Sequence, residues 1–219
     1  MNYEEKGSGD ALILLHGNGE DHRNFAAQVE FFSREFRVIA LDTRGHGGSG
    51  RGVSPFTISQ FADDLYDFMR EKGLERANIL GFSDGGNVAL LFALRHGDMV
   101  ERLILNGANL FNEGCKKSVN RWIENEYNSA LARGDKATAD LMALMIFEPN
   151  LKPADLRGLK MPVLVIAGTS DMILKKHTRL IAHSIANSKL VFIEGDHFIA
   201  YKNPVAFNEA VDSFLQATK

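Results

Sequence analysis

Short apolar runs recur along the chain, separated by longer stretches in which apolar and polar residues are mixed. The runs are continuously apolar, which is typical of parallel strands buried on both faces. Between them, apolar residues recur at helical spacing. Strands that alternate with helices in this way predict an α/β protein with an open, mostly parallel sheet and helices on both faces. The expected strands are Ala11–Leu15, Arg37–Leu41, Asn78–Leu80, Arg102–Leu105, Val163–Ala167 and Leu190–Ile193.

Two of the helical stretches begin with recognisable capping residues. Thr57 and Gln60 have the spacing of a capping box, and an apolar stripe that starts at Ile58 follows them. Near the end of the chain, Asn203 precedes Pro204, a residue favoured at the first position of a helix. These signals predict one helix after the second strand and another that ends the chain.

One segment breaks the alternation of strands and helices. Residues 109–160 contain no expected strand, and residues 118–132 and 136–147 look helical. An insertion after a strand of an open α/β sheet is placed to cover a ligand site. We therefore predict a core of residues 1–108 and 161–219 with a helical lid between them. Most apolar side chains of the lid are expected to attach it to the core, and the rest to line a pocket. The lid residues expected to bind substrate are Trp122, Met142 and Met145.

Composition narrows the class of protein. The 219 residues are 45% hydrophobic and 24% charged, as in a soluble globular protein with a sizeable core. The net charge of -3 gives no electrostatic case for a nucleic-acid or membrane partner. The N-terminal residues show no signal-peptide pattern, and no apolar run approaches the roughly 20 residues that span a bilayer. The single cysteine, Cys115, forms no internal disulfide, so we expect a cytoplasmic protein.

The most informative motif is Gly81-Phe82-Ser83-Asp84-Gly85-Gly86, between an expected strand and an expected helix. A G-x-S-x-G sequence in that context predicts a nucleophile elbow, a tight turn that exposes the serine hydroxyl. Glycine is needed on both sides because the residues two before and two after the serine approach each other closely. Without catalytic partners, the same motif would be a glycine-rich turn with no chemistry.

Partners for Ser83 follow two other strands. Asp171 lies on the loop after the strand that ends at Ala167, and His197 lies on the loop after the strand that ends at Ile193. Because parallel strands end on the same side of a sheet, these loops can meet Ser83. Serine is a poor nucleophile unless a histidine takes its proton, and a carboxylate must hold that histidine in the right tautomer. The sequence thus predicts a Ser83, His197 and Asp171 triad.

Each partner also has a structural interpretation. Asp171 could cap the next helix, and His197 could be a loop histidine with ordinary hydrogen bonds. Asp196 competes for the role of the acid, but it adjoins His197 and is poorly placed to face its ring. No H-E-x-x-H or H-x-x-x-H spacing occurs, so we expect no metal site.

A glycine-rich turn, His16-Gly17-Asn18-Gly19, follows the strand Ala11–Leu15. Such a turn can aim a backbone N–H at the oxygen that becomes negatively charged during acyl transfer. We assign the first oxyanion donor to Asn18 and the second to Asp84, the residue after the nucleophile. The His16 side chain is expected to support this turn rather than to take part in the chemistry.

Taken together, these motifs resemble those of α/β-hydrolase-fold serine hydrolases of the small esterase or lactonase kind. The resemblance rests on H-G-N-G at 16–19, L-D-T-R-G-H-G-G-S at 41–49, the elbow at 81–86, P-V-L-V-I-A-G-T-S-D at 162–171 and G-D-H-F at 195–198. It covers the whole chain except the lid. It implies the same triad, no cofactor and a structural role for the loop at 42–47.

The sequence departs from the family pattern at two places. Only Met1 to Glu5 precede Lys6, so the family's first antiparallel strand is expected to be missing or vestigial. Asp84 stands where many relatives carry an apolar residue or glutamine. Its charge could simply stabilise the N-terminus of the following helix. The sharper hypothesis is that the Asp84 side chain binds a cationic group of the substrate.

The sequence therefore predicts a hydrolase of small carboxylic esters, lactones or thioesters that works through an acyl-enzyme on Ser83. Three alternatives stay open, because this fold hosts many activities. A carbon–carbon bond hydrolase and a cofactor-free peroxidase use a similar triad. A non-catalytic protein that binds small molecules could keep the pocket without turnover.

Overall fold

The computed structural model describes residues 1–217 and is built around one seven-stranded sheet. The strand order is β1-β3-β2-β4-β5-β6-β7, and every neighbouring pair is parallel except β1 with β3. The expected mostly parallel α/β sheet is therefore confirmed, and each of the six expected strands is present. The strands are β1 (Tyr3–Lys6), β2 (Ala11–Leu15), β3 (Arg37–Leu41), β4 (Ala77–Phe82), β5 (Val100–Asn106), β6 (Val163–Gly168) and β7 (Ser188–Ile193).

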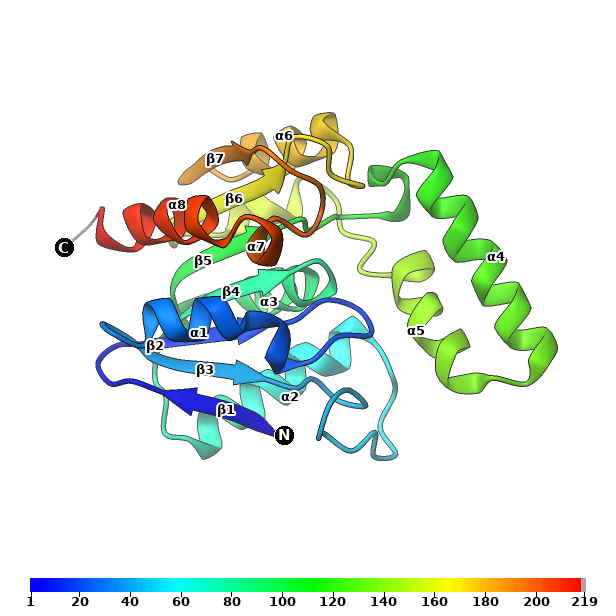
Figure 1. Cartoon of the computed structure of the whole chain (residues 1–219), viewed down its shortest axis with the longest axis horizontal. Coiled ribbons are helices and arrows are strands. Elements are labelled where there is room, and N and C mark those ends of the chain that lie inside the picture. The colour runs from blue at the N-terminus through cyan, green and yellow to red at the C-terminus, as the bar shows by residue number, and fades with distance from the viewer. Residues whose placement is uncertain (218–219) are drawn as a thin grey trace.

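Helices connect the strands and cover both faces of the sheet (Figure 1). The α-helices are α1 (Ala26–Phe32), α2 (Ile58–Glu71), α3 (Asp84–Arg95), α4 (Lys117–Arg133), α5 (Lys136–Phe147), α6 (Lys175–Ser184), α7 (Ile199–Lys202) and α8 (Pro204–Gln216). Short 3₁₀ helices are η1 (His22–Phe25), η2 (Gly97–Met99), η3 (Asn112–Gly114) and η4 (Asp155–Gly158). The capping signals are located as expected, because Thr57 accepts from the Gln60 N–H and Pro204 begins α8.

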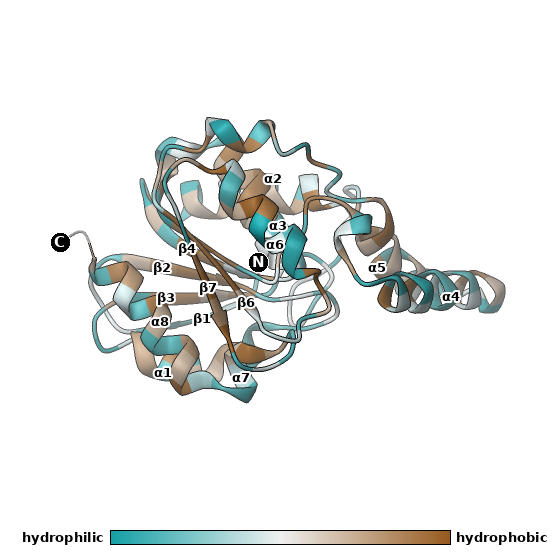
Figure 2. Ribbon diagram, turned by 90° about the horizontal axis from the view of Figure 1, so that it is seen from above, coloured by the Kyte–Doolittle hydropathy of each residue, from teal (hydrophilic) through white to brown (hydrophobic). Residues whose placement is uncertain are grey.

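Two apolar cores lie on opposite faces of the sheet. Alternate residues of each strand point to opposite faces, so Leu12 and Leu14 join one core while Ile13 and Leu15 join the other. Figure 2 shows α1 and α8 on one face and α2, α3 and α6 on the other. Because helices cover both faces, both sets of strand residues must be apolar, which explains the continuous apolar runs in the sequence.

An antiparallel strand lies at the edge of the sheet, where we expected the first strand to be missing or vestigial. The four residues of β1 pair with β3, with Tyr3 opposite Leu41 and Lys6 opposite Val38. Only Tyr3 of this strand is partly buried, so no apolar run marks it in the sequence. Its backbone pairing provides the attachment, and so the expected absence is corrected to a short strand.

The two helices of the insertion stand beside the C-terminal ends of the strands (Figure 1). Helices α4 and α5 pack mainly against each other, and α4 buries only Ile123 and Ala130. Later residues of the expected lid behave differently, since Leu156 and Leu159 are buried in the core. None of the helices in residues 1–217 combines the length and apolarity needed to cross a lipid bilayer.

Candidate active site

Ser83 occupies a strained turn between β4 and α3. Its φ of 53° and ψ of -120° lie in a region that non-glycine residues seldom adopt. The turn is tight enough to exclude side chains on either side of the serine. A Cβ on Gly81 would lie 2.2 Å from the Gly85 carbonyl oxygen, and one on Gly85 would lie 2.1 Å from the Leu15 carbonyl oxygen. The glycines therefore allow Ser83 to project from the end of β4.

Asp171 and His197 come from the loops after β6 and β7, and the structure brings both to Ser83. His197 Nε2 lies 3.0 Å from Ser83 Oγ, and His197 Nδ1 lies 2.7 Å from Asp171 Oδ1. A carboxylate accepts, so Nδ1–H donates to Asp171 and Nε2 is left to accept the proton of the Ser83 hydroxyl. This is the tautomer that a general base for serine requires.

Hydrogen bonds from several donors hold the Asp171 carboxylate in place. It is buried and accepts from the Ile173 N–H at 2.9 Å and the Gly168 N–H at 3.3 Å, in addition to His197. A Cβ on Gly107 would lie 2.7 Å from His197 Cε1, so the imidazole packs tightly against the end of β5. Asp196 faces elsewhere, because its carboxylate accepts from the Phe198 N–H and pairs with Lys202.

The turn that contains Asn18 lies beside Ser83. Neither the Asn18 N–H nor the Asp84 N–H is used in a hydrogen bond with any residue that the structure describes. The Asp84 N–H is one of the free donors at the start of α3, where the helix dipole also favours negative charge. The sequence-predicted oxyanion donors are thus both unengaged and both next to the serine.

Two buried histidines support this turn. His16 Nε2 accepts from the Thr43 N–H at 3.0 Å, and its Nδ1–H donates to the Gly17 carbonyl at 2.8 Å. His46 Nε2 accepts from the Gly19 N–H at 3.2 Å. Burial lowers the pKa of His16 to about 4, so at neutral pH it keeps the lone pair that it needs as an acceptor. His16 therefore supports the turn, as its position in the sequence suggested.

The side chain of Asp84 does not lie where the sequence hypothesis placed it. It is 7% exposed, and it lines a small buried space with His16 and His46 rather than the cavity that contains Ser83. Its Oδ2 accepts from Asn18 Nδ2 at 2.8 Å. Burial raises the pKa of Asp84 to about 6. The expected contact between this carboxylate and a cationic substrate group is therefore corrected, because the first turn of α3 points the side chain into the core.

A cavity of about 260 Å³ opens in front of Ser83 between the core and helices α4 and α5. The three lid residues named from the sequence line this cavity together. Met142 is buried in its wall, while Trp122 is 58% exposed at the same site. The cavity is mostly apolar. Its other lining side chains are Asn18, Glu20, Phe82, Ser83, Val119, Ile123, Leu141, Met172, His197 and Phe198.

Sequence reasoning missed Glu20, which also lines this cavity. Its carboxylate accepts from the Gly17 N–H at 3.1 Å and from the Tyr201 hydroxyl. Burial raises the pKa of Glu20, although both donors oppose the shift. The sequence feature that could have identified Glu20 was its position directly after the glycine-rich turn that contains Asn18.

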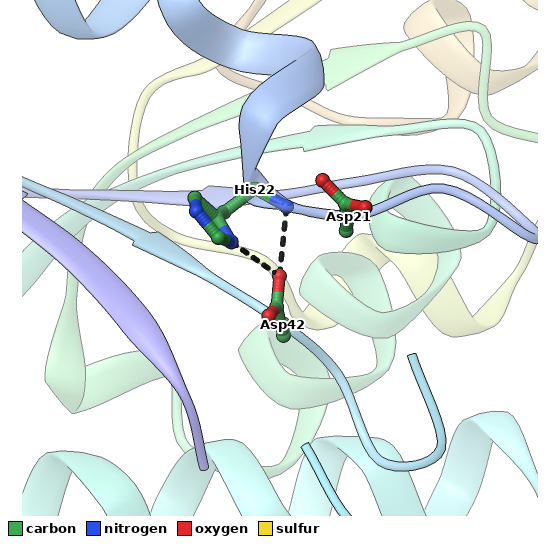
Figure 3. A group of neighbouring side chains, drawn as sticks. All are labelled: Asp21, His22 and Asp42. Atoms are coloured by element: carbon green, nitrogen blue, oxygen red, sulfur yellow. Dashed lines mark hydrogen bonds and ion pairs between the residues drawn. The ribbon is translucent and has the colours of Figure 1, made fainter. Parts of the chain in front are cut away.

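A second group of polar side chains lies at the start of η1, just before α1 (Figure 3). Asp21, His22 and Asp42 place potential ligand atoms within 4.8 Å of one another. Each of them already has protein partners. Asp42 Oδ1 accepts from the His22 N–H at 2.8 Å and from the His22 ring at 2.7 Å, and Asp21 caps η1 and pairs with Arg23. These hydrogen bonds connect the loop after β3 to the start of η1.

Comparisons with known proteins support the fold described above. A family model for the α/β hydrolase fold matches residues 10–114. The 3-oxoadipate enol-lactonase 2 of Acinetobacter baylyi is 25% identical, covering 99% of this chain and 93% of that protein. Serine hydrolase BPHL of Homo sapiens is 26% identical, covering 99% of this chain and 83% of that protein.

Solved structures give the same result. The enol-lactonase from Burkholderia xenovorans LB400 has a TM-score of 0.78 at 25% identity, covering 98% of this chain and 95% of the other. The sheet order, the serine turn, the matched family model and this structural likeness all point to one assignment. The chain has the α/β hydrolase fold.

Proposed function

We propose that the protein is a serine hydrolase of small carboxylic esters, lactones or thioesters, with Ser83 as nucleophile, His197 as base and Asp171 as the residue that orients the base. The carrying observation is the continuous hydrogen-bond chain from Ser83 Oγ through His197 to Asp171, which opens onto an apolar cavity. The likeness to an enol-lactonase and a serine hydrolase supports the same class of reaction.

The proposed reaction has two halves. Ser83 Oγ attacks the carbonyl carbon as its proton passes to His197 Nε2, and the imidazolium is stabilised by Asp171. The N–H groups of Asn18 and Asp84 donate to the tetrahedral oxyanion. Collapse breaks the bond to the alcohol or thiol, which leaves with the proton of His197. A water molecule then gives a proton to His197 and attacks the acyl-enzyme, which releases the carboxylic acid and regenerates Ser83.

The cavity supports small substrates. Pockets for drug-sized ligands are commonly about 300–1,000 Å³, and this one is slightly smaller at about 260 Å³. Its apolar walls suit an acyl or alcohol group without many polar atoms. We also propose a cytoplasmic location, in which Cys115 stays reduced. Burial raises the pKa of this thiol to about 12, so it is a poor nucleophile at neutral pH.

The test is a comparison of the wild type with Ser83→Ala on a panel of p-nitrophenyl esters, lactones and thioesters. We expect kcat to fall by several orders of magnitude, with an equal loss in His197→Gln, because residues of a triad act as a unit. Full activity in Ser83→Ala would overturn the mechanism. Turnover of carbon–carbon bonds without ester turnover would favour that alternative, and thermal stabilisation by ligands without product would favour a binding protein.

A further inference from the structure

The cavity in front of Ser83 has an unbalanced charge. Among its lining residues in the described part of the chain, Glu20 is the one carboxylate, and none is Lys or Arg. The remaining side chains are apolar apart from Asn18, Ser83 and His197. A substrate that carries its own carboxylate would therefore meet a negative charge without a cation to balance it.

Hydrogen bonds hold the Glu20 carboxylate in place but leave some of its acceptor positions unused. Tyr201 donates to Oε1 and the Gly17 N–H donates to Oε2, whereas a carboxylate offers about four acceptor positions. Burial and the neighbouring Glu20 charge raise the pKa of Tyr201, so its hydroxyl keeps the proton that it donates. The side chain is only partly buried, and it lines the open cavity. Acceptor positions thus remain for a bound group.

The carboxylate also lies near the reacting atoms. A Cβ on Gly17 would lie 3.2 Å from Glu20 Oε2 and 3.1 Å from the Phe82 ring. The Phe82 ring centroid is in turn 4.8 Å from that of His197. Glu20 and the imidazole line the same cavity and are close enough to interact electrostatically. A charged group on a bound ester would interact strongly with the Glu20 carboxylate, because the apolar walls screen charge poorly.

We propose that Glu20 determines the charge specificity of the site, by binding a cationic ammonium group of the ester and repelling esters that carry a second carboxylate. This inference rests on the proposed ester hydrolysis and names its substrate class. It assigns to Glu20 the charge recognition that the sequence had suggested for Asp84. The Asp84 carboxylate is unsuited to that role because it is buried and paired with Asn18.

The test uses three p-nitrophenyl esters whose acyl chains share one methylene linker and end in methyl, ammonium or carboxylate. In the wild type, kcat/KM is expected to be lowest for the carboxylate ester. In Glu20→Gln, the ratio of kcat/KM for the ammonium ester to that for the carboxylate ester should fall at least about tenfold, with the methyl ester changed by less than about threefold. Comparing ratios between variants cancels the intrinsic reactivity of each ester.

Two matched variants serve as controls. Glu75→Gln makes the same charge change on an exposed residue before β4, at the opposite end of the sheet, and should leave all three values unchanged. Asp84→Asn removes the other nearby carboxylate and should leave the ratio unchanged, whatever it does to the overall rate. A ratio shift in Asp84→Asn that equals the shift in Glu20→Gln would overturn the assignment to Glu20.

The outcomes separate this inference from the proposed function. If Ser83→Ala abolishes turnover but Glu20→Gln lowers all three rates equally, ester hydrolysis stands and Glu20 only braces the turn. If the wild type cleaves no ester, the proposed function fails. The thermal shifts produced by the corresponding ammonium and carboxylate amides then test the role of Glu20. Stabilisation by the ammonium amide in the wild type but not in Glu20→Gln supports it, and equal shifts in the two proteins overturn it.

Discussion

The Asn18 side chain donates to the Asp84 carboxylate at 2.8 Å, and this hydrogen bond joins the two residues whose N–H groups are the proposed oxyanion donors. The same Asn18 Nδ2 donates to the Leu141 carbonyl of α5 at 2.8 Å. One amide therefore connects the turn after β2, the start of α3 and a helix of the insertion. A displacement of α5 would therefore disturb the hydrogen bond between the two proposed oxyanion residues.

Replacing Asn18 should therefore affect stability as well as catalysis. In Asn18→Ala, the buried Asp84 carboxylate loses its amide partner, which should lower the free energy of unfolding by about 1–3 kcal/mol. Urea denaturation at pH 7.5 measures this loss. The same substitution in an Asp84→Ala background should cost much less, because the carboxylate is then absent. Equal losses in the two backgrounds would contradict the pairing.

The raised pKa of Asp84 predicts a pH dependence of stability. Because burial raises this pKa from 3.8 to about 6, the folded protein binds a proton that the unfolded chain has already released. The stabilising contribution is complete below about pH 4 and is lost as the pH rises through 6. Asp84→Asn lacks this titration, so its stability relative to the wild type should rise by about 2–3 kcal/mol between pH 4 and pH 7. Urea midpoints across that range test the sign, and a flat difference would contradict it.

The serine turn should not accept a side chain at Gly85. A Cβ there would lie 2.1 Å from the Leu15 carbonyl oxygen, and backbone cannot move away as a flexible side chain can. We expect Gly85→Ala to destabilise the protein by more than about 3 kcal/mol and to abolish activity. Gly158→Ala is the control, since its Cβ would meet no atom within 4 Å. Differential scanning calorimetry of both variants would settle the comparison, and equal melting temperatures would refute the clash.

Two exposed aromatic residues of the insertion should differ in function. Trp122 is 58% exposed and Phe147 is 61% exposed, but only Trp122 lines the cavity. Trp122→Ala should raise KM several-fold for esters with longer acyl chains, because it removes apolar contact area at the cavity wall. Phe147→Ala should leave KM unchanged. Steady-state kinetics on an acyl-length series separate the two, and a similar effect of both variants would argue against the observed cavity.

Much of the fold was predictable because two simple rules apply. Buried parallel strands must be apolar on both faces, so their positions were visible as runs such as Val163–Ala167. Parallel strands also end at one edge, so residues as distant in sequence as Ser83 and His197 could be expected to meet. Strand β1 could not be predicted because it contains no apolar run. It is held in the sheet by backbone hydrogen bonds, which any sequence can form.

The direction of a side chain was harder to predict than the position of its backbone. Asp84 follows Ser83 immediately, but Ser83 lies in the strained turn and Asp84 begins α3, so the Asp84 carboxylate enters the core while the serine faces the cavity. Glu20 shows the reverse case, since nothing in its local pattern says that Tyr201, far along the chain, will turn it toward the cavity. Such contacts depend on tertiary packing, and a single sequence does not encode them in any local pattern.

Three methionines, Met142, Met145 and Met172, form part of the wall of the cavity that Glu20 also lines. Methionine is unbranched and has a polarizable thioether, so it changes rotamer easily and fills irregular spaces at little cost. Glu20, by contrast, is anchored by two donors. The cavity therefore combines a rigidly held polar group with compliant apolar walls. A protein built in this way would be strict about the charge of its substrate and tolerant of its shape, so that related molecules of different outline share one enzyme.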